Sequence, residues 1–104
     1  MAHTTYAYKN MSESEKSFLE NYLSKKTDRL ETLMKRFSSG DCRLEVRAEK
    51  FATKAAYKIE MMLHLPGHTL LAKEDDHTVI EATDFALDKL IIQLRKLVDK
   101  KNNK

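Results

Sequence analysis

Hydrophobic and polar residues alternate along two stretches of the chain, which predicts two half-buried β-strands. The alternation runs from Cys42 to Ala48 and again from Tyr57 to Leu65, with mostly charged residues at the positions between. Strands of this kind are typical of a sheet that is covered on one face only. Residues 3–9 and 69–73 predict a first and a fourth strand, and the Pro-Gly pair at 66–67 predicts a turn before the fourth.

Apolar residues recur at three- and four-residue steps in two longer stretches, which predicts two amphipathic helices. The first is expected from Ser12 to about Phe37 and the second from about Val79 to beyond Val98. Each begins with the Ser/Thr-x-x-Glu pattern of a capping box. The acidic run at 74–76 is expected to complement the positive end of the second helix. The apolar faces comprise Leu19, Leu23, Leu30, Leu33, Met34 and Phe37 in the first helix, and Val79, Thr83, Ala86, Leu87, Leu90, Ile91, Leu94, Leu97 and Val98 in the second.

The order of these elements is β-α-β-β-β-α, and each element has one apolar side that needs a partner. The pattern predicts a two-layer α+β fold, with both helices packed on one face of a four-stranded sheet. The other sheet face is expected to meet solvent or a ligand. A chain of 104 residues can bury one such core but not two, so we expect a single domain over residues 1–104.

Charge is distributed unevenly along the chain, although the net charge is only +3. Residues 89–104 hold six basic residues and one acidic residue, which leaves residues 1–88 with a net charge of −2. A basic segment suits an acidic partner such as nucleic acid, and a solvated, solubilising tail explains terminal lysines equally well. Composition does not distinguish the two interpretations.

A helical projection places cations along one flank of each apolar face. In the second helix the flank is formed by Lys89, Gln93, Lys96 and Lys100, and in the first by Lys25, Arg29 and Arg36. A one-sided row of cations suits a phosphate backbone, and an ordinary solvated helix flank is the alternative. Phe85 and Ile92 project near the lysine row and would extend a contact surface or be covered by another segment.

Sites for catalysis or for a cofactor are not expected. The four histidines, His3, His64, His68 and His77, lack the spacing by which a helix presents zinc ligands. Cys42 is the only cysteine, so no internal disulfide can form, and its place in the alternation predicts an inward-packing thiol rather than a nucleophile. No apolar run approaches the length of a membrane span, which together with the lone cysteine favours a cytoplasmic location.

Residues 63–96 resemble the ribosome hibernation-promoting factors and ribosome-associated inhibitors of the sigma-54 modulation protein family. The resemblance rests on the helix pattern D-K-L-x-x-Q-L-x-K, which this chain carries from Asp88 to Lys96, and on the order of elements along the whole chain. The chain departs from the family where the last helix opens with Val79-Ile80-Glu81-Ala82-Thr83-Asp84 in place of M-Y-A-A-I-D. It is similar to the short form, which has no C-terminal dimerisation domain.

The resemblance implies a translation inhibitor that binds the decoding region of the small ribosomal subunit, in the space needed by tRNA and mRNA. It implies small-subunit rRNA as the partner, a monomer when free, and no membrane, cofactor or small-molecule substrate. A protein-interaction or dimerisation module that uses the open sheet face is the alternative. The residues expected to contact rRNA are Lys25, Arg29, Arg36, Lys89, Gln93, Arg95, Lys96, Lys100 and Lys101.

Overall fold

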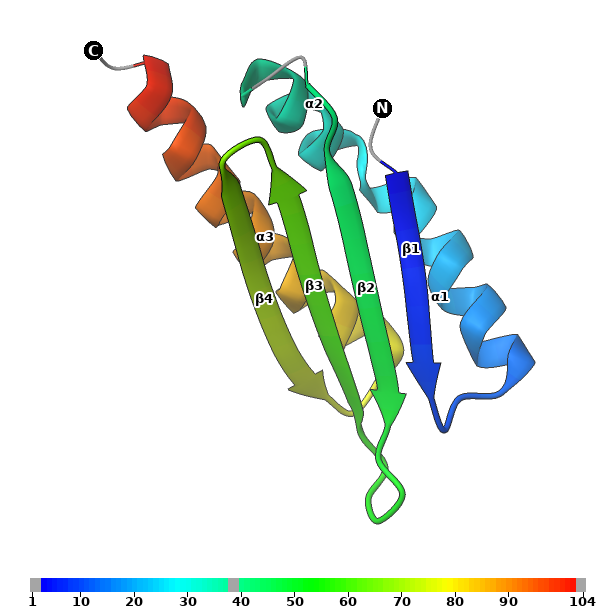
Figure 1. The fold of residues 1–104 in the computed structure, drawn as a ribbon. Coiled ribbons are helices and arrows are strands. Elements are labelled where there is room, and N and C mark those ends of the chain that lie inside the picture. Colours follow the sequence, from blue (N-terminus) through cyan, green and yellow to red (C-terminus); the bar gives the residue numbers. More distant parts are fainter. Residues whose placement is uncertain (1–2, 38–39, 103–104) are drawn as a thin grey trace.

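A four-stranded sheet carries all the helices on one of its faces, so the predicted two-layer α+β architecture is confirmed (Figure 1). The computed structural model describes residues 3–37 and 40–102. The strands lie in the order β1-β2-β3-β4, with β1 parallel to β2 and the other neighbours antiparallel. The elements are β1 (His3–Lys9), α1 (Glu13–Lys26), α2 (Asp28–Phe37), β2 (Arg43–Lys50), β3 (Tyr57–Leu65), β4 (His68–Asp76) and α3 (Val79–Asn102).

The first helical stretch is divided into α1 and α2, so the prediction of one continuous helix from Ser12 to Phe37 is wrong. The division lies at Thr27, which ends α1 with φ −88° and ψ 0°. Two hydroxyl groups bond back to carbonyls there: Ser24 to the carbonyl of Asn21 at 2.9 Å, and Thr27 to that of Ser24 at 3.5 Å. Such bonds compete with the helical ladder and bend it. The apolar period continues in phase across the break, which is why it gave no sign of two helices.

Strand β4 is longer than predicted, because the acidic run Glu74, Asp75 and Asp76 pairs with β3. Lys58 lies opposite Asp75 and Tyr57 opposite Asp76. These acids therefore lie in a strand that ends shortly before the last helix, and their role in complementing the positive end of that helix stays a prediction. One of these pairs, Lys58 with Asp75, places opposite charges on facing residues, which favours the extension into a sequence of poor strand propensity.

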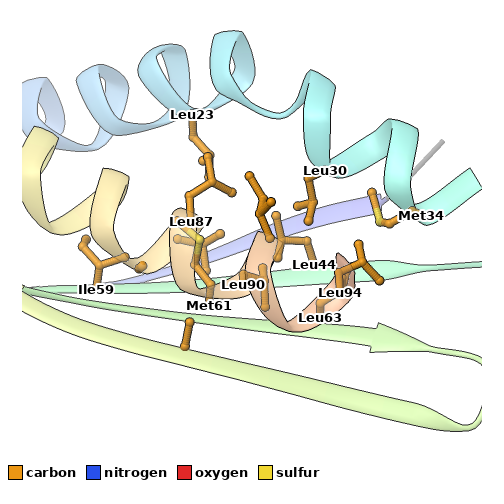
Figure 2. Close-up of a cluster of buried hydrophobic side chains, with 14 of the residues drawn as sticks. Leu23, Leu30, Met34, Leu44, Ile59, Met61, Leu63, Leu87, Leu90 and Leu94 are labelled. Atoms are coloured by element: carbon orange, nitrogen blue, oxygen red, sulfur yellow. The ribbon is translucent and has the colours of Figure 1, made fainter. Parts of the chain in front are cut away.

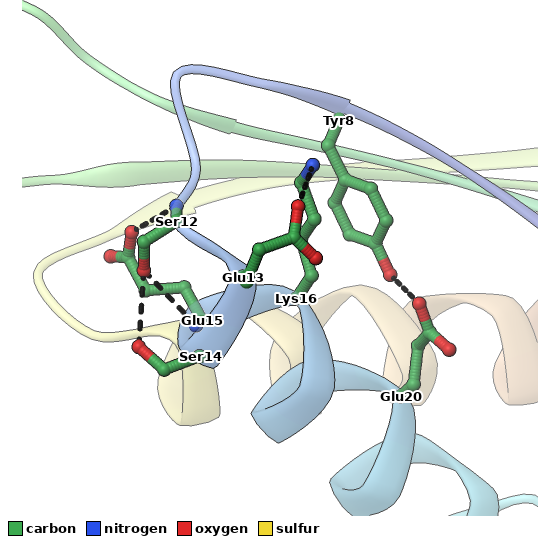
Figure 3. Close-up of polar contacts among 7 residues, drawn as sticks. All are labelled: Tyr8, Ser12, Glu13, Ser14, Glu15, Lys16 and Glu20. Atoms are coloured by element: carbon green, nitrogen blue, oxygen red, sulfur yellow. Dashed lines mark hydrogen bonds and ion pairs between the residues drawn. The ribbon is translucent and has the colours of Figure 1, made fainter.

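Side-chain caps define where α1 and α3 begin. Ser12 and Glu15 form the predicted reciprocal box: the Glu15 amide donates to the Ser12 hydroxyl at 3.2 Å, and the Ser12 amide donates to the Glu15 carboxylate at 2.8 Å (Figure 3). Thr78 accepts from the Glu81 amide at 3.1 Å, but Glu81 in turn accepts from the Thr78 hydroxyl rather than from its amide. The second predicted box is thus only half formed.

The core lies between the sheet and the helix layer. Leu23, Leu30 and Met34 project from α1 and α2 toward residues of β2 and β3, and α3 contributes a row of leucines beside them (Figure 2). Every residue predicted for the two apolar helix faces is buried except Leu97, which is half-buried against the core. Burial of this kind supplies the main driving force for folding.

Three tyrosines fasten α1 to its neighbours through carboxylates. Tyr8 of β1 donates to Glu20 at 2.5 Å (Figure 3), Tyr57 of β3 donates to Glu15 at 2.5 Å, and Tyr22 of α1 donates to Asp84 of α3 at 2.7 Å. Burial, followed by the bond to Asp84, raises the pKa of the Tyr22 hydroxyl to about 12. These bonds fix the position of α1 relative to both the sheet and α3.

Candidate RNA-binding surface

Positive charge is concentrated at one end of the helix layer. Residues 25–37 and 95–101 hold nine basic and three acidic residues, a net charge of +6. These two segments, hereafter the basic end, comprise the last turn of α1 with all of α2, and the last turns of α3; α2 packs against α3. Both helices run toward the same end of the sheet, where α2 and α3 finish (Figure 1). The tertiary structure therefore joins cations that are 59 to 76 residues apart in the chain into one surface.

The opposite end of the helix layer is acidic. Residues 13–24 and 79–94 hold six acidic and two basic residues, a net charge of −4. Acids in the first turn and bases in the last turn complement the helix dipoles, which explains part of this polarity. Glu20, Asp84, Arg29 and Lys96 lie beyond those turns, however, so the dipole does not account for the whole arrangement.

The predicted cations of the first helical stretch are all exposed, but they come from two helices. Lys25 belongs to the last turn of α1, and Arg29 and Arg36 belong to α2. The break at Thr27 means that they do not form the straight row that a single helix would give. They nevertheless remain on the basic end, where Lys26 and Lys35 join them. Sequence reasoning missed those two lysines because it followed only one flank of the helix.

Lys89 and Gln93 lie along the free edge of β4 and bond to its carbonyls, although Lys89 remains exposed. The Lys89 ammonium lies 2.5 Å from a Glu74 carboxylate oxygen and donates to the carbonyl of Lys73 at 3.3 Å. The Gln93 amide donates to the carbonyl of Leu71 at 2.9 Å. Unpaired carbonyls on an edge strand invite further strand pairing, and these two side chains cap them. A structural role thus competes with the predicted RNA contact at both positions.

The remaining predicted residues lie in the last two turns of α3. Arg95, Lys96 and Lys100 are exposed, and no carboxylate of the described residues lies within ion-pair distance of them. Lys101 donates a short hydrogen bond to the carbonyl of Phe37, and its ammonium lies 4.9 Å from the Phe37 ring centroid. Lys101 therefore ties α3 to the end of α2, whereas the other three cations are available to phosphates.

The open face of the sheet carries charges that largely pair with one another. Glu45 lies 3.5 Å from Arg43, 3.9 Å from Arg47 and 2.8 Å from His64. Lys73 pairs with Glu60 in the same way, at 3.4 Å. Because these cations already have acidic neighbours, the open face attracts a polyanion less strongly than the basic end does.

The described residues offer little support for a metal site, a reactive cysteine or a membrane span. In the stretches 3–37 and 40–102, no three His, Cys, Asp or Glu side chains gather as a group that could hold a metal ion. Cys42 is half-buried against the core and its thiol contacts the carbonyl of Gly40 at 3.7 Å, which agrees with the predicted inward packing. Burial raises the pKa of this thiol and so disfavours the reactive thiolate. No helix in the described part of the chain is long and apolar enough to span a membrane.

Comparison with known proteins gives matches of two kinds. The N-terminal domain of Protein Y from Thermus thermophilus has 18% sequence identity and a TM-score of 0.64, over 90% of this chain and 97% of that one. A ribosomal subunit interface protein from Coxiella burnetii has 16% identity and a TM-score of 0.52, over 90% and 94%. At these identities the structures show a shared fold. No curated protein matches significantly.

The second kind of match concerns the family itself, and it spans nearly the whole chain. The family described as Sigma 54 modulation protein / S30EA ribosomal protein matches residues 5–102, from the first strand to the end of α3. That range includes both segments of the basic end and the helix pattern from Asp88 to Lys96. The chain therefore belongs to the Sigma 54 modulation protein / S30EA ribosomal protein family.

Proposed function

We propose that this protein binds rRNA of the small ribosomal subunit through the basic end and thereby inhibits translation in the cytoplasm. The observation that carries the proposal is the net charge of +6 that the end of α1, α2 and the end of α3 present at one end of the molecule, in a chain of this family. Phosphates are the strongest source of affinity for such a surface, and the shape of a folded RNA supplies the specificity.

The proposed binding site on the ribosome is the decoding region, where the protein would occupy space needed by tRNA and mRNA. The candidate contacts are the exposed cations Lys25, Arg29, Arg36, Arg95, Lys96 and Lys100. Lys89, Gln93 and Lys101 remain candidates, but each also holds a contact within the protein. Inhibition by occupancy needs no chemistry, and a monomeric domain is sufficient for it.

Cosedimentation with purified ribosomal subunits tests the proposal. We expect the protein to sediment with small subunits, to be released by salt, and to lower protein synthesis in a reconstituted translation system. Adding tRNA and mRNA before the protein should weaken the inhibition, since all three are proposed to compete for one space. Equal binding to large subunits, or full translation at a molar excess of protein, would contradict the proposal.

A further inference from the structure

A groove separates the first turns of α1 and α3, at the acidic end of the helix layer. It is lined by Phe18 of α1, Tyr57 of β3, and Val79 and Ile80 of α3, with His77 at its edge. Its volume of about 470 Å³ lies within the range of binding sites in proteins. The RNA-binding proposal does not use this groove, and of these lining residues Val79 and Tyr57 also contribute to the hydrophobic core beneath it.

The groove exposes apolar side chains that are held in place. Phe18 is 46% exposed and Ile80 is 39% exposed. The Phe18 ring stacks on Tyr22 with centroids 6.1 Å apart, and the Tyr22 hydroxyl is held by Asp84. This Tyr22–Asp84 bond joins α1 to α3 one turn beyond the groove. Side chains that are ordered before binding lose less entropy when a partner covers them.

Carboxylates without a basic partner lie near these apolar side chains, whereas Glu15, which lines the groove, lies 3.7 Å from Lys50. In the described part of the chain, no lysine, arginine or histidine lies within 4.0 Å of the carboxylates of Asp76, Glu81 or Asp84. Asp84 accepts a hydrogen bond from the Tyr22 hydroxyl and Glu81 accepts one from the Thr78 hydroxyl, and both donors are neutral, so the charge of these carboxylates is not neutralised by the protein. The surface repels a nucleic acid and attracts a cation.

We infer that this groove is a docking site for a protein segment in which apolar side chains are flanked by lysine or arginine. The apolar side chains would cover Phe18 and Ile80, and the flanking cations would pair with Glu81 and Asp84. The surface and its occupant are then complementary in both hydrophobicity and charge. Because the groove and the basic end lie at opposite ends of the helix layer, the protein can hold RNA and such a segment together.

The test uses the intact protein and a defined probe, a fluorescein-labelled peptide with leucines one helical turn apart and lysine and arginine at the other positions. Fluorescence anisotropy should show saturable binding, and backbone amide NMR shifts should change in residues 14–18 and 77–80 of the unmodified protein. Shift changes confined to other surfaces, or no saturation up to about 1 mM, would overturn the inference. The NMR measurement needs no variant, so it remains decisive if a substitution harms folding.

Two double variants distinguish binding in the groove from non-specific binding to exposed apolar side chains. Phe18→Ser with Ile80→Ser should weaken peptide binding by about tenfold or more, as expected for central apolar contacts. The matched control is Phe85→Ser with Ile92→Ser, which removes side chains of the same kind that are 46% and 50% exposed on α3 but do not line the groove. Equal losses in both pairs would overturn the inference.

A second experiment tests whether the charge of the peptide contributes to binding in addition to its apolar side chains. A peptide with glutamate in place of every lysine and arginine should lose most of its affinity, and Glu81→Gln should reduce the salt dependence of binding to the basic peptide. If the acidic peptide bound as tightly as the basic one, the assigned occupant would be wrong. The double variant of Phe18 and Ile80 should bind ribosomes as the wild type does. A loss of peptide binding is then distinct from a failure of the proposed RNA-binding function.

Discussion

Lys101, near the end of α3, donates a hydrogen bond to the main-chain carbonyl of Phe37, at the end of α2, and its ammonium lies over the Phe37 ring. The last carbonyls of a helix have no partner within the helix, so a lysine supplied by another helix satisfies one of them. This contact holds together the two segments that form the basic end.

Removing that contact should loosen the end of α2. We expect Lys101→Met to lower the free energy of unfolding by about 1 kcal/mol, the usual net value of one hydrogen bond. Amide hydrogen exchange should become faster in the last turn of α2. Lys100→Met is the control, since it removes the same charge from an exposed position; equal effects of the two changes would show that the contact contributes nothing.

The exposed cations of the basic end should determine ribosome binding. Changing Arg36, Lys96 and Lys100 to Gln should weaken binding, because fewer counterions are released when fewer phosphates are contacted. The slope of log K against log salt should decrease by about two to three units for three lost contacts. Quantitative cosedimentation at several salt concentrations measures both quantities.

The control for that experiment removes three cations from the other end of the molecule, by changing Lys9, Lys54 and Lys58 to Gln. The change in net charge is identical, so a general loss of attraction would appear in both variants. If the two triple variants lost affinity equally, binding would depend on total charge and not on the basic end. If the Arg36, Lys96, Lys100 variant kept the wild-type affinity and salt slope, these residues would belong to an ordinary solvated helix flank and not to an RNA contact.

Lys89 should behave differently from Lys96, although both fit the same predicted row. Lys89→Met removes the pair with Glu74 and the bond to the Lys73 carbonyl, and we expect a loss of up to about 1 kcal/mol in stability. Its effect on the salt dependence of ribosome binding should be small. A thermal melt and a salt titration of each single variant check this; the reverse order of effects would assign Lys89 to the RNA contact.

The bond from Tyr22 to Asp84 should make stability fall at alkaline pH. The pKa of Tyr22 is raised from its ordinary 10.0 to about 12 in the folded protein. The raised pKa means that the contribution of Tyr22 is complete below pH 10 and is lost as the pH approaches 12. Tyr22→Phe keeps the ring beside Phe18 and should remove this part of the pH dependence, at a cost of about 1 kcal/mol at neutral pH. The measurement is the free energy of unfolding as a function of pH. If the variant lost as much stability at alkaline pH as the wild type, the loss would belong to other tyrosines.

Cys42 should be replaceable without loss of function. Its thiol is half-buried just before β2, and burial raises its pKa, which disfavours the thiolate. Cys42→Val or Cys42→Ala should cost at most about 1 kcal/mol and leave ribosome binding intact. A variant that stays folded by circular dichroism but no longer binds ribosomes would show that the thiol has a role of its own.

The sequence by itself determined the order of the strands and helical stretches, the two-layer arrangement and almost all of the core, but not the division of the first helical stretch at Thr27. Residues 57–65 alternate with period two, and Val79 to Val98 follow the helical period. Each pattern has only one face that can be buried, so it fixes both the type of element and the side that packs on the core. The caps at Ser12 and Thr78 are equally local, since the donor and acceptor lie within one helical turn.

The tertiary structure alone decided which cations are free. Lys89, Lys96 and Lys101 are alike in sequence, but they lie respectively against the β4 edge, in solvent and against the end of α2. A helical projection gives the direction of each side chain around its own axis and nothing about the neighbour it meets. The basic end, the groove between α1 and α3 and the capped strand edge all join residues distant in the chain, so they depend on how the layers pack.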